Sequence, residues 1–284
     1  MRKKAIKILL VFAFILLIIV GLVYFIGGGF GMKRPVVPEM VAGRTQALFA
    51  HRGVVVEFPE NSREAILRAK QLGFTCLEVD LRKTADGEFV LFHDGDCRRL
   101  LGIEAELTAL STAEVKRHKL LANGTVTACE VLTLKEMLDE FGHDFLFYFD
   151  LKLKNTRDAE DLAQVIEQYG ITENSIVASA SPAVIMCIEF RHPEILTALE
   201  GLNAGKEWLY MLIPKNLKPD YLSGFASKVD KAHVDWLRRH DLLPNRIVYG
   251  VDSSNYQEVT SLGIRNMIID YFPGLDSAFQ DPGP

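Results

Sequence analysis

Short apolar runs and amphipathic segments alternate along most of this chain. Apolar runs bounded by turn-forming residues are typical of buried strands, and apolar residues repeated every three or four positions are typical of helices. The predicted strands cover residues 46–51, 75–81, 145–152, 175–179, 195–199, 225–230, 246–251 and 265–270. The predicted helices cover residues 63–72, 158–169, 183–190, 233–240 and 255–262. Eight strands separated by helices predict an α/β protein with a (β/α)8 TIM barrel, and 284 residues are enough for one.

A hairpin is predicted directly after the second strand. Residues 88–92 form the predicted return strand, and Asp86-Gly87 before them is the strongest short hairpin signal that a sequence offers. If these two residues form the turn, His93 lies opposite Asp80. The hairpin therefore brings a histidine beside an acidic side chain.

Residues 95–142 contain no strongly predicted strand. Two helix starts are legible in this stretch, because Ser111 is followed by Glu114 and Thr133 by Glu136 in the spacing of a capping box. We interpret the stretch as a segment inserted after the second strand and large enough to overhang a pocket.

The N-terminus predicts a single membrane anchor. Residues 5–26 carry Lys7 as their one charge, and 22 residues are enough to cross a hydrocarbon core of about 30 Å. Basic residues precede this segment, so the positive-inside tendency places the N-terminus in the cytoplasm and the body outside. A cleaved signal peptide is the alternative, but the apolar run exceeds the usual length of about 7 to 15 residues and no clear cleavage site follows it. The predicted divisions are a basic end 1–4, an anchor 5–26, a linker 27–44 and the barrel 45–284.

The charges argue against a nucleic-acid partner. The first 26 residues carry four of the 32 basic residues and none of the 37 acidic residues, which leaves a net charge of −9 on the rest. Such a body is not drawn by its charge to nucleic acid or to anionic lipid.

The four cysteines have no spacing typical of a metal site; they are Cys76, Cys97, Cys129 and Cys187. We interpret them as small buried hydrophobic residues. Cys97 and Cys129 lie on the two sides of a loop predicted to cover the site, and an oxidising exterior would permit a bridge between them. The sequence leaves both possibilities open.

The residues with the most chemical capacity lie between positions 50 and 94. Glu78 and Asp80 are two apart on a predicted strand and therefore share a face, and paired carboxylates bind hard divalent cations. His51 and His93 bracket them, and histidine is the usual general acid or base near neutral pH. Arg52 can hold a phosphate in a bidentate way. Together these side chains suit a metal-assisted attack on a phosphodiester.

Five short motifs in this order and spacing resemble the glycerophosphodiester phosphodiesterase family. They are His51-Arg52-Gly53, Pro59-Glu60-Asn61-Ser62, Glu78-Val79-Asp80, Asp86-Gly87 and His93-Asp94. A weaker resemblance extends over residues 46–273. It implies a TIM barrel that hydrolyses glycerophosphodiesters to sn-glycerol 3-phosphate and an alcohol, with a Ca2+ or Mg2+ ion and with His51 and His93 as the catalytic pair.

The resemblance also assigns roles farther along the chain. The resemblance implies that Asp150 is the third metal ligand, after Glu78 and Asp80. It also implies that Lys152, like Arg52, contacts the substrate phosphate. Glutamate is more common in the family at the position of Asp150, so the shorter side chain here leaves room for a shifted ion or one more water. A plain ion pair at the end of a strand is the other reading of Asp150 and Lys152.

Several alternatives stay open from the sequence. Glu78 and Asp80 could form strand-end salt bridges, and His51 and His93 could belong to a zinc site. Glu60 either fixes Arg52 or a metal-bound water or favours the N-terminus of the next helix. Asn61 is also undecided. The other histidines are expected to be structural; they are His118, His143, His192, His233 and His240.

The substrate head group is the least defined feature. The chain has Tyr249-Gly250-Val251-Asp252 where the family often has a tryptophan motif, and Ile269 where it often has threonine before Asp270. A lysophospholipase D or sphingomyelinase D-like enzyme acting on lipids is therefore one alternative. A non-catalytic module tethered to the membrane is another. The sequence does not define the oligomeric state.

Overall fold

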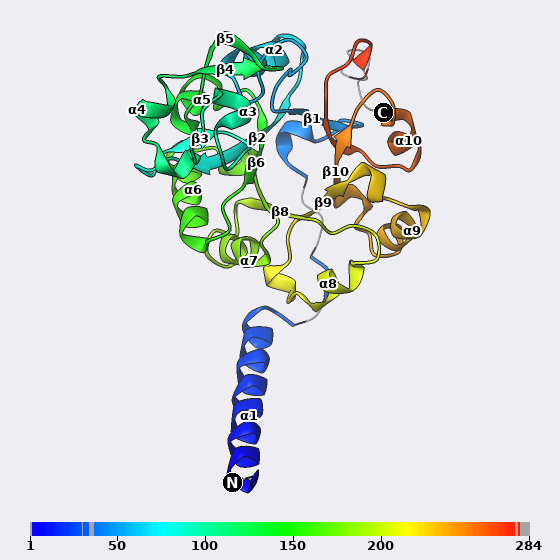
Figure 1. Cartoon of the computed structure of the whole chain (residues 1–284). Coiled ribbons are helices and arrows are strands. Elements are labelled where there is room, and N and C mark those ends of the chain that lie inside the picture. The colour runs from blue at the N-terminus through cyan, green and yellow to red at the C-terminus, as the bar shows by residue number, and fades with distance from the viewer. Residues whose placement is uncertain (1, 30, 34–36, 276–277, 279–284) are drawn as a thin grey trace.

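The computed structural model describes residues 2–29, 31–33, 37–275 and 278. Within these residues eight parallel strands form a closed barrel in the order β1, β2, β6, β7, β8, β9, β10, β11, and β11 pairs back with β1 (Figure 1). The strands are β1 Ala47–His51, β2 Cys76–Lys83, β6 Leu146–Leu151, β7 Ser175–Ser179, β8 Leu196–Glu200, β9 Tyr221–Phe225, β10 Arg246–Val251 and β11 Asn266–Ile269. The predicted TIM barrel is confirmed.

Helices surround the barrel and join its strands. They are α2 Arg63–Gln71, α3 Arg98–Leu101, α4 Thr112–Val115, α5 Leu134–Phe141, α6 Thr156–Gln168, α7 Pro182–Arg191, α8 Glu207–Leu212, α9 Lys231–Arg239 and α10 Tyr256–Ser261. Both predicted capping boxes are present, at Ser111 before α4 and at Thr133 before α5. Each pairs the cap hydroxyl with the glutamate three residues later, which satisfies two backbone N–H groups that a helix start leaves free.

Alternate residues of the barrel strands point inward. Leu146 and Tyr148 of β6 belong to the apolar cluster inside the barrel, whereas Phe147 and Phe149 pack in the larger cluster beneath the helices. The same alternation, continued past Tyr148, places Asp150 on the inner side at the carboxyl end of the strand. The hydrophobic pattern that makes the barrel thus also aims polar residues into its mouth.

The hairpin after β2 differs from the prediction by one residue. Strand β3 (Phe89–Leu91) pairs Leu81 with Leu91, so Asp80 faces Phe92 rather than His93. The predicted two-residue turn was wrong, because Gly87 has a φ of +83° and closes a three-residue loop in which the Asp86 carboxylate accepts a hydrogen bond from Thr84. Three-residue loops with such a residue in their last position are the next most common hairpin type.

Two further predictions of secondary structure were wrong. The inserted segment contains the hairpin β4 (Lys119–Ala122) and β5 (Thr125–Glu130), where no strong strand was expected. The strand predicted at 225–230 lies at Tyr221–Phe225, and the short 3-10 helix η5 (Ala226–Lys228) follows it. The stretch after β8, which had no regular prediction, contains α8.

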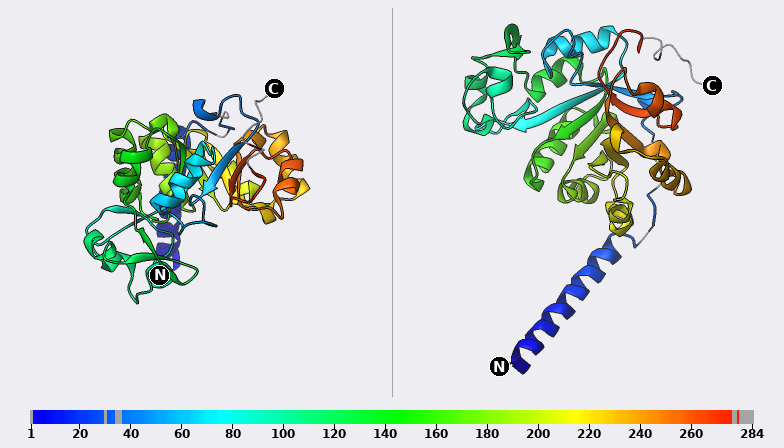
Figure 2. Two further views of the ribbon diagram at one scale, coloured as in Figure 1. Left: turned by 90° about the horizontal axis from the view of Figure 1, so that it is seen from above. Right: turned by 45° about the vertical axis from the view of Figure 1, so that its right-hand side comes forward.

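The N-terminal segment is one long helix that projects from the barrel (Figures 1 and 2). Helix α1 spans Arg2–Ile26, and its stretch Ala5–Leu22 has a mean hydropathy of 3.0 and is exposed throughout. By length and composition this helix can cross a membrane, and an N-terminal signal sequence has the same properties.

The chain beyond α1 is fixed to the barrel. Lys33 lies between the carboxylates of Glu189 and Asp220, with Nζ to oxygen distances of 2.6 and 2.7 Å. Both carboxylates are almost fully buried, so this ion triad is shielded from solvent. Part of the segment expected to be a simple spacer therefore makes specific contacts with the body.

All four cysteines are free thiols in the structure. Cys97 and Cys129 are buried in one apolar cluster of the inserted segment, and the pair forms no bridge. Their packing agrees with the reading as small hydrophobic residues.

Candidate active site

The predicted site residues meet at the carboxyl ends of neighbouring strands. His51 ends β1, Glu78 and Asp80 lie in β2, and Asp150 lies in β6 beside them, with Asp80 paired in register with Asp150. Lys152 follows β6 directly. The barrel thus brings together residues that are a hundred positions apart.

Three buried carboxylates form a cluster. Glu78, Asp80 and Asp150 are between 0 and 7% exposed, and each contributes an oxygen within 4.8 Å of the others. Carboxylates are rarely buried without compensation, because an unpaired buried charge is costly. The cluster holds no histidine among the described residues, and its oxygen ligands are those that hard divalent cations prefer.

Two cations flank Asp80. Arg52 Nε lies 2.9 Å from one carboxylate oxygen of Asp80, and Lys152 Nζ lies 2.9 Å from the other and also contacts Asp150. Asn61 donates a further hydrogen bond of 2.9 Å to Asp80. Burial raises the pKa of Asp80, but the two cations outweigh it and the pKa lies below its ordinary value. Asp80 therefore stays ionised.

The other two acids have the opposite tendency. Burial, together with the charge of Asp80, raises the pKa of Glu78 well above its ordinary value. Burial also raises the pKa of Asp150, although Lys152 opposes the change. Only two cations lie near the three carboxylates, and a bound divalent cation would supply the charge that compensates the third.

Each predicted catalytic histidine is oriented by an aspartate. His51 Nδ1 lies 2.7 Å from Asp270, which is 219 residues away and follows β11. His93 Nδ1 lies 2.7 Å from its neighbour Asp94. Because a carboxylate accepts a hydrogen bond, Nδ1 carries the proton in both rings, which leaves Nε2 as the free acceptor of the neutral form.

A chain of charged residues connects the two sides of the site. Glu60 accepts hydrogen bonds from Arg52 Nη1 at 2.9 Å and from both terminal nitrogens of Arg99 at 2.7 and 2.8 Å. Arg99 also donates a 2.7 Å hydrogen bond to Asp94, the partner of His93. Of the roles left open for Glu60, its contact with Arg52 is the one the geometry supports. Arg99, which the sequence reasoning missed, links the inserted segment to the site.

The backbone after β1 is shaped to hold Arg52. Arg52 and Asn61 have φ values of +55° and +58°, which non-glycine residues rarely adopt. Gly53, at a φ of +85°, lies so close to α2 that a Cβ would come within 2.6 Å of the Ala65 backbone. Such unfavourable conformations persist where the surrounding structure enforces them, and they cluster at functional sites.

All of the predicted site residues except Asp80 line one cavity of about 350 Å³. Its wall consists of His51, Arg52, Glu78, His93, Asp150, Lys152, Glu200, Phe225, Tyr249, Gly250 and Ile268. Phe225 and Tyr249 contact each other with their ring centres 4.4 Å apart, and Phe225 is 50% exposed. The two rings form an aromatic part of the cavity wall, and Tyr249 belongs to the stretch where the family often has a tryptophan motif.

Glu200 was missed by the sequence reasoning. It ends β8, one residue beyond the predicted strand, and its carboxylate accepts a 3.1 Å hydrogen bond from Tyr148. Burial, with the charge of Asp150, raises the pKa of Glu200 to about 8. An acidic residue at the carboxyl end of a barrel strand was the available signal, as it was for Asp150.

The histidines expected to be structural do not line this cavity. His192 contacts Glu160 and Glu167 on the barrel surface, and His233 contacts Glu207 at 2.7 Å. His240 is hydrogen-bonded to the backbone of Trp236. Their polar partners account for these three side chains without a chemical role.

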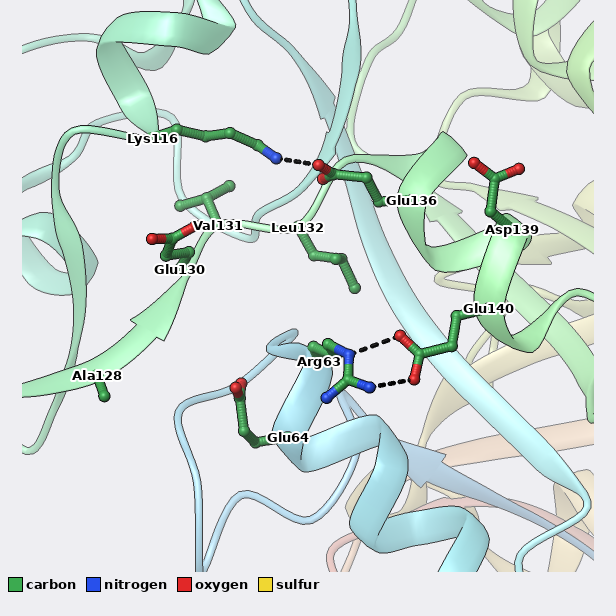
Figure 3. A pocket seen from close by; sticks show the side chains of 10 residues that line it. All are labelled: Arg63, Glu64, Lys116, Ala128, Glu130, Val131, Leu132, Glu136, Asp139 and Glu140. Carbon is green, nitrogen blue, oxygen red and sulfur yellow. Dashed lines mark hydrogen bonds and ion pairs between the residues drawn. The ribbon is translucent and has the colours of Figure 1, made fainter.

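A larger cavity lies between α2, α5 and the inserted hairpin (Figure 3). It has a volume of about 640 Å³ and is lined mainly by acidic residues. Three of its five acidic residues are already paired, since Glu140 receives two hydrogen bonds from Arg63, Glu136 receives one from Lys116 and Glu130 receives one from Lys119. None of the predicted site residues lines this cavity, so its size does not make it the stronger candidate.

The fold and this site define a TIM barrel with an acidic cluster and flanking histidines at the carboxyl ends of its strands. The model of the glycerophosphoryl diester phosphodiesterase family matches residues 51–245. Because this match covers more than half of the chain, the protein belongs to that family.

Curated relatives carry the same family name. The human glycerophosphodiester phosphodiesterase 1 is 30% identical over 156 residues, which are 53% of this chain and 47% of the relative. The glycerophosphodiester phosphodiesterase of Caldanaerobacter subterraneus is 30% identical over 138 residues, or 46% of this chain and 57% of the relative. The chain thus spans about half the length of the curated relatives that it matches.

Solved structures share the fold over a larger part of the chain. The phosphodiesterase from Oleispira antarctica, solved in complex with the product sn-glycerol-3-phosphate, has a TM-score of 0.70 and 19% identity, and the match covers 82% of this chain and 96% of that one. A glycerophosphodiester phosphodiesterase from Parabacteroides distasonis has a TM-score of 0.66 and 20% identity, over 84% and 97% of the two chains.

Proposed function

We propose that this protein is a metal-dependent phosphodiesterase that hydrolyses glycerophosphodiesters to sn-glycerol 3-phosphate and an alcohol. The observation that carries the proposal is the convergence of three carboxylates, two cationic side chains and two carboxylate-oriented histidines on one barrel mouth. Family membership and the product named for the Oleispira antarctica structure support the same substrate class.

The proposed cofactor is a Ca2+ or Mg2+ ion held by Glu78, Asp80 and Asp150. The fit rests on the donor set, since three buried carboxylates converge within 4.8 Å and offer oxygen ligands alone. When bound, such an ion neutralises charge on a phosphodiester and stabilises the charge that develops during its cleavage. The absence of histidine from the described cluster argues against the zinc reading.

Arg52 and Lys152 are the proposed contacts for the non-bridging oxygens of the phosphate. Both line the cavity, and their side chains are 16 and 20% exposed. The Glu60 contact fixes the guanidinium of Arg52, so its orientation is set before a substrate binds. Burial lowers the pKa of Lys152, but Asp150 and Asp80 outweigh it and raise the pKa above its ordinary value, so Lys152 stays charged.

His51 and His93 are the proposed acid-base pair. In each ring the aspartate partner holds Nδ1, which leaves Nε2 to take a proton from the attacking hydroxyl or water or to give one to the leaving alcohol. Removing either imidazole should cost about 10²- to 10⁴-fold in turnover, as is typical for general acid-base catalysis.

We further propose that α1 anchors the barrel to a membrane, with the N-terminus in the cytoplasm and the catalytic body on the other side. Its exposed apolar stretch Ala5–Leu22 supports the span, and the basic residues before it support the orientation. Protease protection of the N-terminus in sealed vesicles tests this topology.

A lipid-directed phosphodiesterase is the second candidate. A cavity of about 440 Å³, lined largely by apolar side chains including Leu199, Leu202 and Leu209, shares Glu200 with the candidate active site. A hydrocarbon chain of a lipid substrate fits such a lining, and this supports a lipid-directed activity of either the lysophospholipase D or the sphingomyelinase D-like kind.

A product-release assay on glycerophosphocholine and lysophosphatidylcholine, with and without chelator, tests these proposals. We expect chelation to abolish release of sn-glycerol 3-phosphate from glycerophosphocholine, and we expect His51→Ala and His93→Ala to reduce it as above. The matched control is His143→Ala, because His143 is exposed and lies outside the cavity. Near-normal activity of both site variants would refute the acid-base assignment, and no activity on any phosphodiester would leave the binding module as the better description.

A further inference from the structure

Helix α8 presents most of its apolar side chains to the outside. Trp208, Leu209, Met211 and Leu212 are 59, 39, 42 and 60% exposed, whereas Tyr210 is 1% exposed and joins the helix to the body. Fully burying a side chain of this kind is worth about 1.5 to 3 kcal/mol, and α8 forgoes much of that gain. Exposed apolar groups that are contiguous in this way mark an interaction surface.

This surface lies next to the end of α1. Helix α8 is followed by the 3-10 helix η4 (Lys215–Leu217), whose backbone holds the chain that leaves α1. Lys215 N donates a 2.9 Å hydrogen bond to Gly29, and Asn216 N donates one of 2.8 Å to Gly27. Figures 1 and 2 show α8 as part of the barrel wall nearest to α1.

The connection between α8 and the α1 exit is well anchored. Tyr210 and Met32 pack in the same apolar cluster, one from α8 and one from the chain after α1. The buried ion triad of Lys33 with Glu189 and Asp220 follows directly. Because these contacts tie both segments to one part of the barrel, a membrane that holds α1 also determines where α8 lies.

The ends of α8 suit the polar boundary of a bilayer. Lys206 and Lys215 are exposed on either side of the apolar surface, and Lys side chains can extend their charge toward lipid phosphates while their stems stay apolar. Glu207, the acidic residue of the helix, is turned to His233 at 2.7 Å. Trp208 is the residue type most characteristic of the membrane interface.

We propose that α8 docks into the interfacial layer of the same bilayer that α1 spans, with Trp208 and Leu212 inserted among the lipids. This inference rests on the proposed anchor function of α1. Helix α8 belongs to the connection between β8 and β9, which begins at Glu200 in the wall of the candidate active site. Docking of α8 therefore holds the side of the barrel that carries β8 and β9 close to the lipid surface.

The test uses the full chain in vesicles of phosphatidylcholine, with or without bromine atoms on the upper part of the acyl chains. The sequence has two tryptophans, so Trp236→Phe leaves Trp208 as the emitting residue. We expect brominated lipid to quench Trp208. The matched control is Trp208→Phe, Trp236→Phe, Val126→Trp, because Val126 is 68% exposed on the inserted hairpin, and its emission should be unaffected.

Equal emission of Trp208 with both lipids would overturn the proposal. If Trp208 is then also shielded from a water-soluble quencher such as iodide, a second protein chain covers α8 instead. If Trp236→Phe does not fold, the emission of Trp208 is obtained as the difference between the emission of the native chain and that of Trp208→Phe. This difference is then compared between the two lipids.

Carbonate extraction of vesicles separates the two proposals. A chain that is washed off by alkaline carbonate has no anchor, which overturns both. A chain that stays in the vesicles while Trp208 remains unquenched keeps the anchor and loses the docking of α8.

Discussion

Lys152→Met tests the charge balance of the acidic cluster. Lys152 Nζ lies 2.9 Å from Asp80, a pair that attracts by about 6 kcal/mol at an effective dielectric constant of about 20. Part of that attraction only offsets the cost of desolvating the lysine. Removing one partner of such a buried pair leaves the other charge unpaired, which should cost about 3 to 5 kcal/mol of stability. Methionine keeps most of the side-chain volume, which makes lost charge the main change.

The assay is thermal unfolding of the full chain in detergent, with chelator and then with Ca2+ or Mg2+. With chelator we expect Lys152→Met to lose about 3 to 5 kcal/mol of unfolding free energy. The divalent ion should then stabilise the variant more than the native protein, because it no longer competes with a positive side chain for Asp80 and Asp150. Turnover should stay low, since the proposed contact with the phosphate is gone.

Lys135→Met is the matched control. Lys135 also pairs with an acid, Glu88, at 3.0 Å, but their side chains are 55 and 41% exposed, so this change should cost less than about 1 kcal/mol. If the two variants lose the same stability with chelator, or if the ion stabilises Lys152→Met no more than the native protein, the account of the cluster is wrong.

Two further predictions follow from contacts near the site and the anchor. Asp270→Asn should lower turnover by about 10- to 100-fold by disturbing the orientation of His51, with unchanged unfolding temperature, and steady-state kinetics beside a thermal melt would show both. Burial, ahead of the charge of Asp220, raises the pKa of Glu189 to about 7 from its ordinary 4.5. The stability that Glu189 contributes is therefore full below pH 4.5 and lost as the pH rises through about 7, a change of up to about 3 kcal/mol. Glu189→Gln should flatten this part of the curve of unfolding free energy against pH, and an unaltered slope would contradict the assignment.

The barrel and most of the candidate site could be predicted because both depend on local alternation. The apolar run Phe145–Phe149 predicts a buried strand. Asp150 directly after it lies at the carboxyl end of the strand, where barrels place functional groups. The motifs of the family then separate Glu78 and Asp80 from ordinary strand-end acids.

Strand β9, which was predicted four residues too late in the chain, shows where prediction from local sequence patterns fails. Tyr221–Phe225 contains Ser223 and Gly224, which have low strand propensity, and the apolar residues after them suggested a later start. The reason lies in the packing on the two faces of the strand. On the inner face Ser223 accepts a hydrogen bond from Tyr148, and on the outer face a Cβ on Gly224 would come within 2.4 Å of the Asn203 side chain. Packing between distant segments selects these small residues, so the sequence of the strand alone does not explain them.

The inserted hairpin was missed for a different reason. Strands Lys119–Ala122 and Thr125–Glu130 bury one residue each, Leu120 and Cys129, so no run of buried apolar residues marks either of them. Contacts such as that of His51 with Asp270 join residues far apart in the chain, and periodicity carries no information about them.

The contacts from Arg52 through Glu60 and Arg99 to Asp94 connect the inserted segment to the proposed acid-base pair. Arg99 lies in the short helix α3 of the inserted segment, and its guanidinium contacts Glu60 and Asp94, which contact the two flanks of the barrel mouth. Replacing this segment with that of a relative should therefore change the surroundings of the His93 imidazole unless the new segment also has an arginine at this position. Through this one side chain, a change in the outer layer of the protein reaches the proposed acid-base residue beneath it.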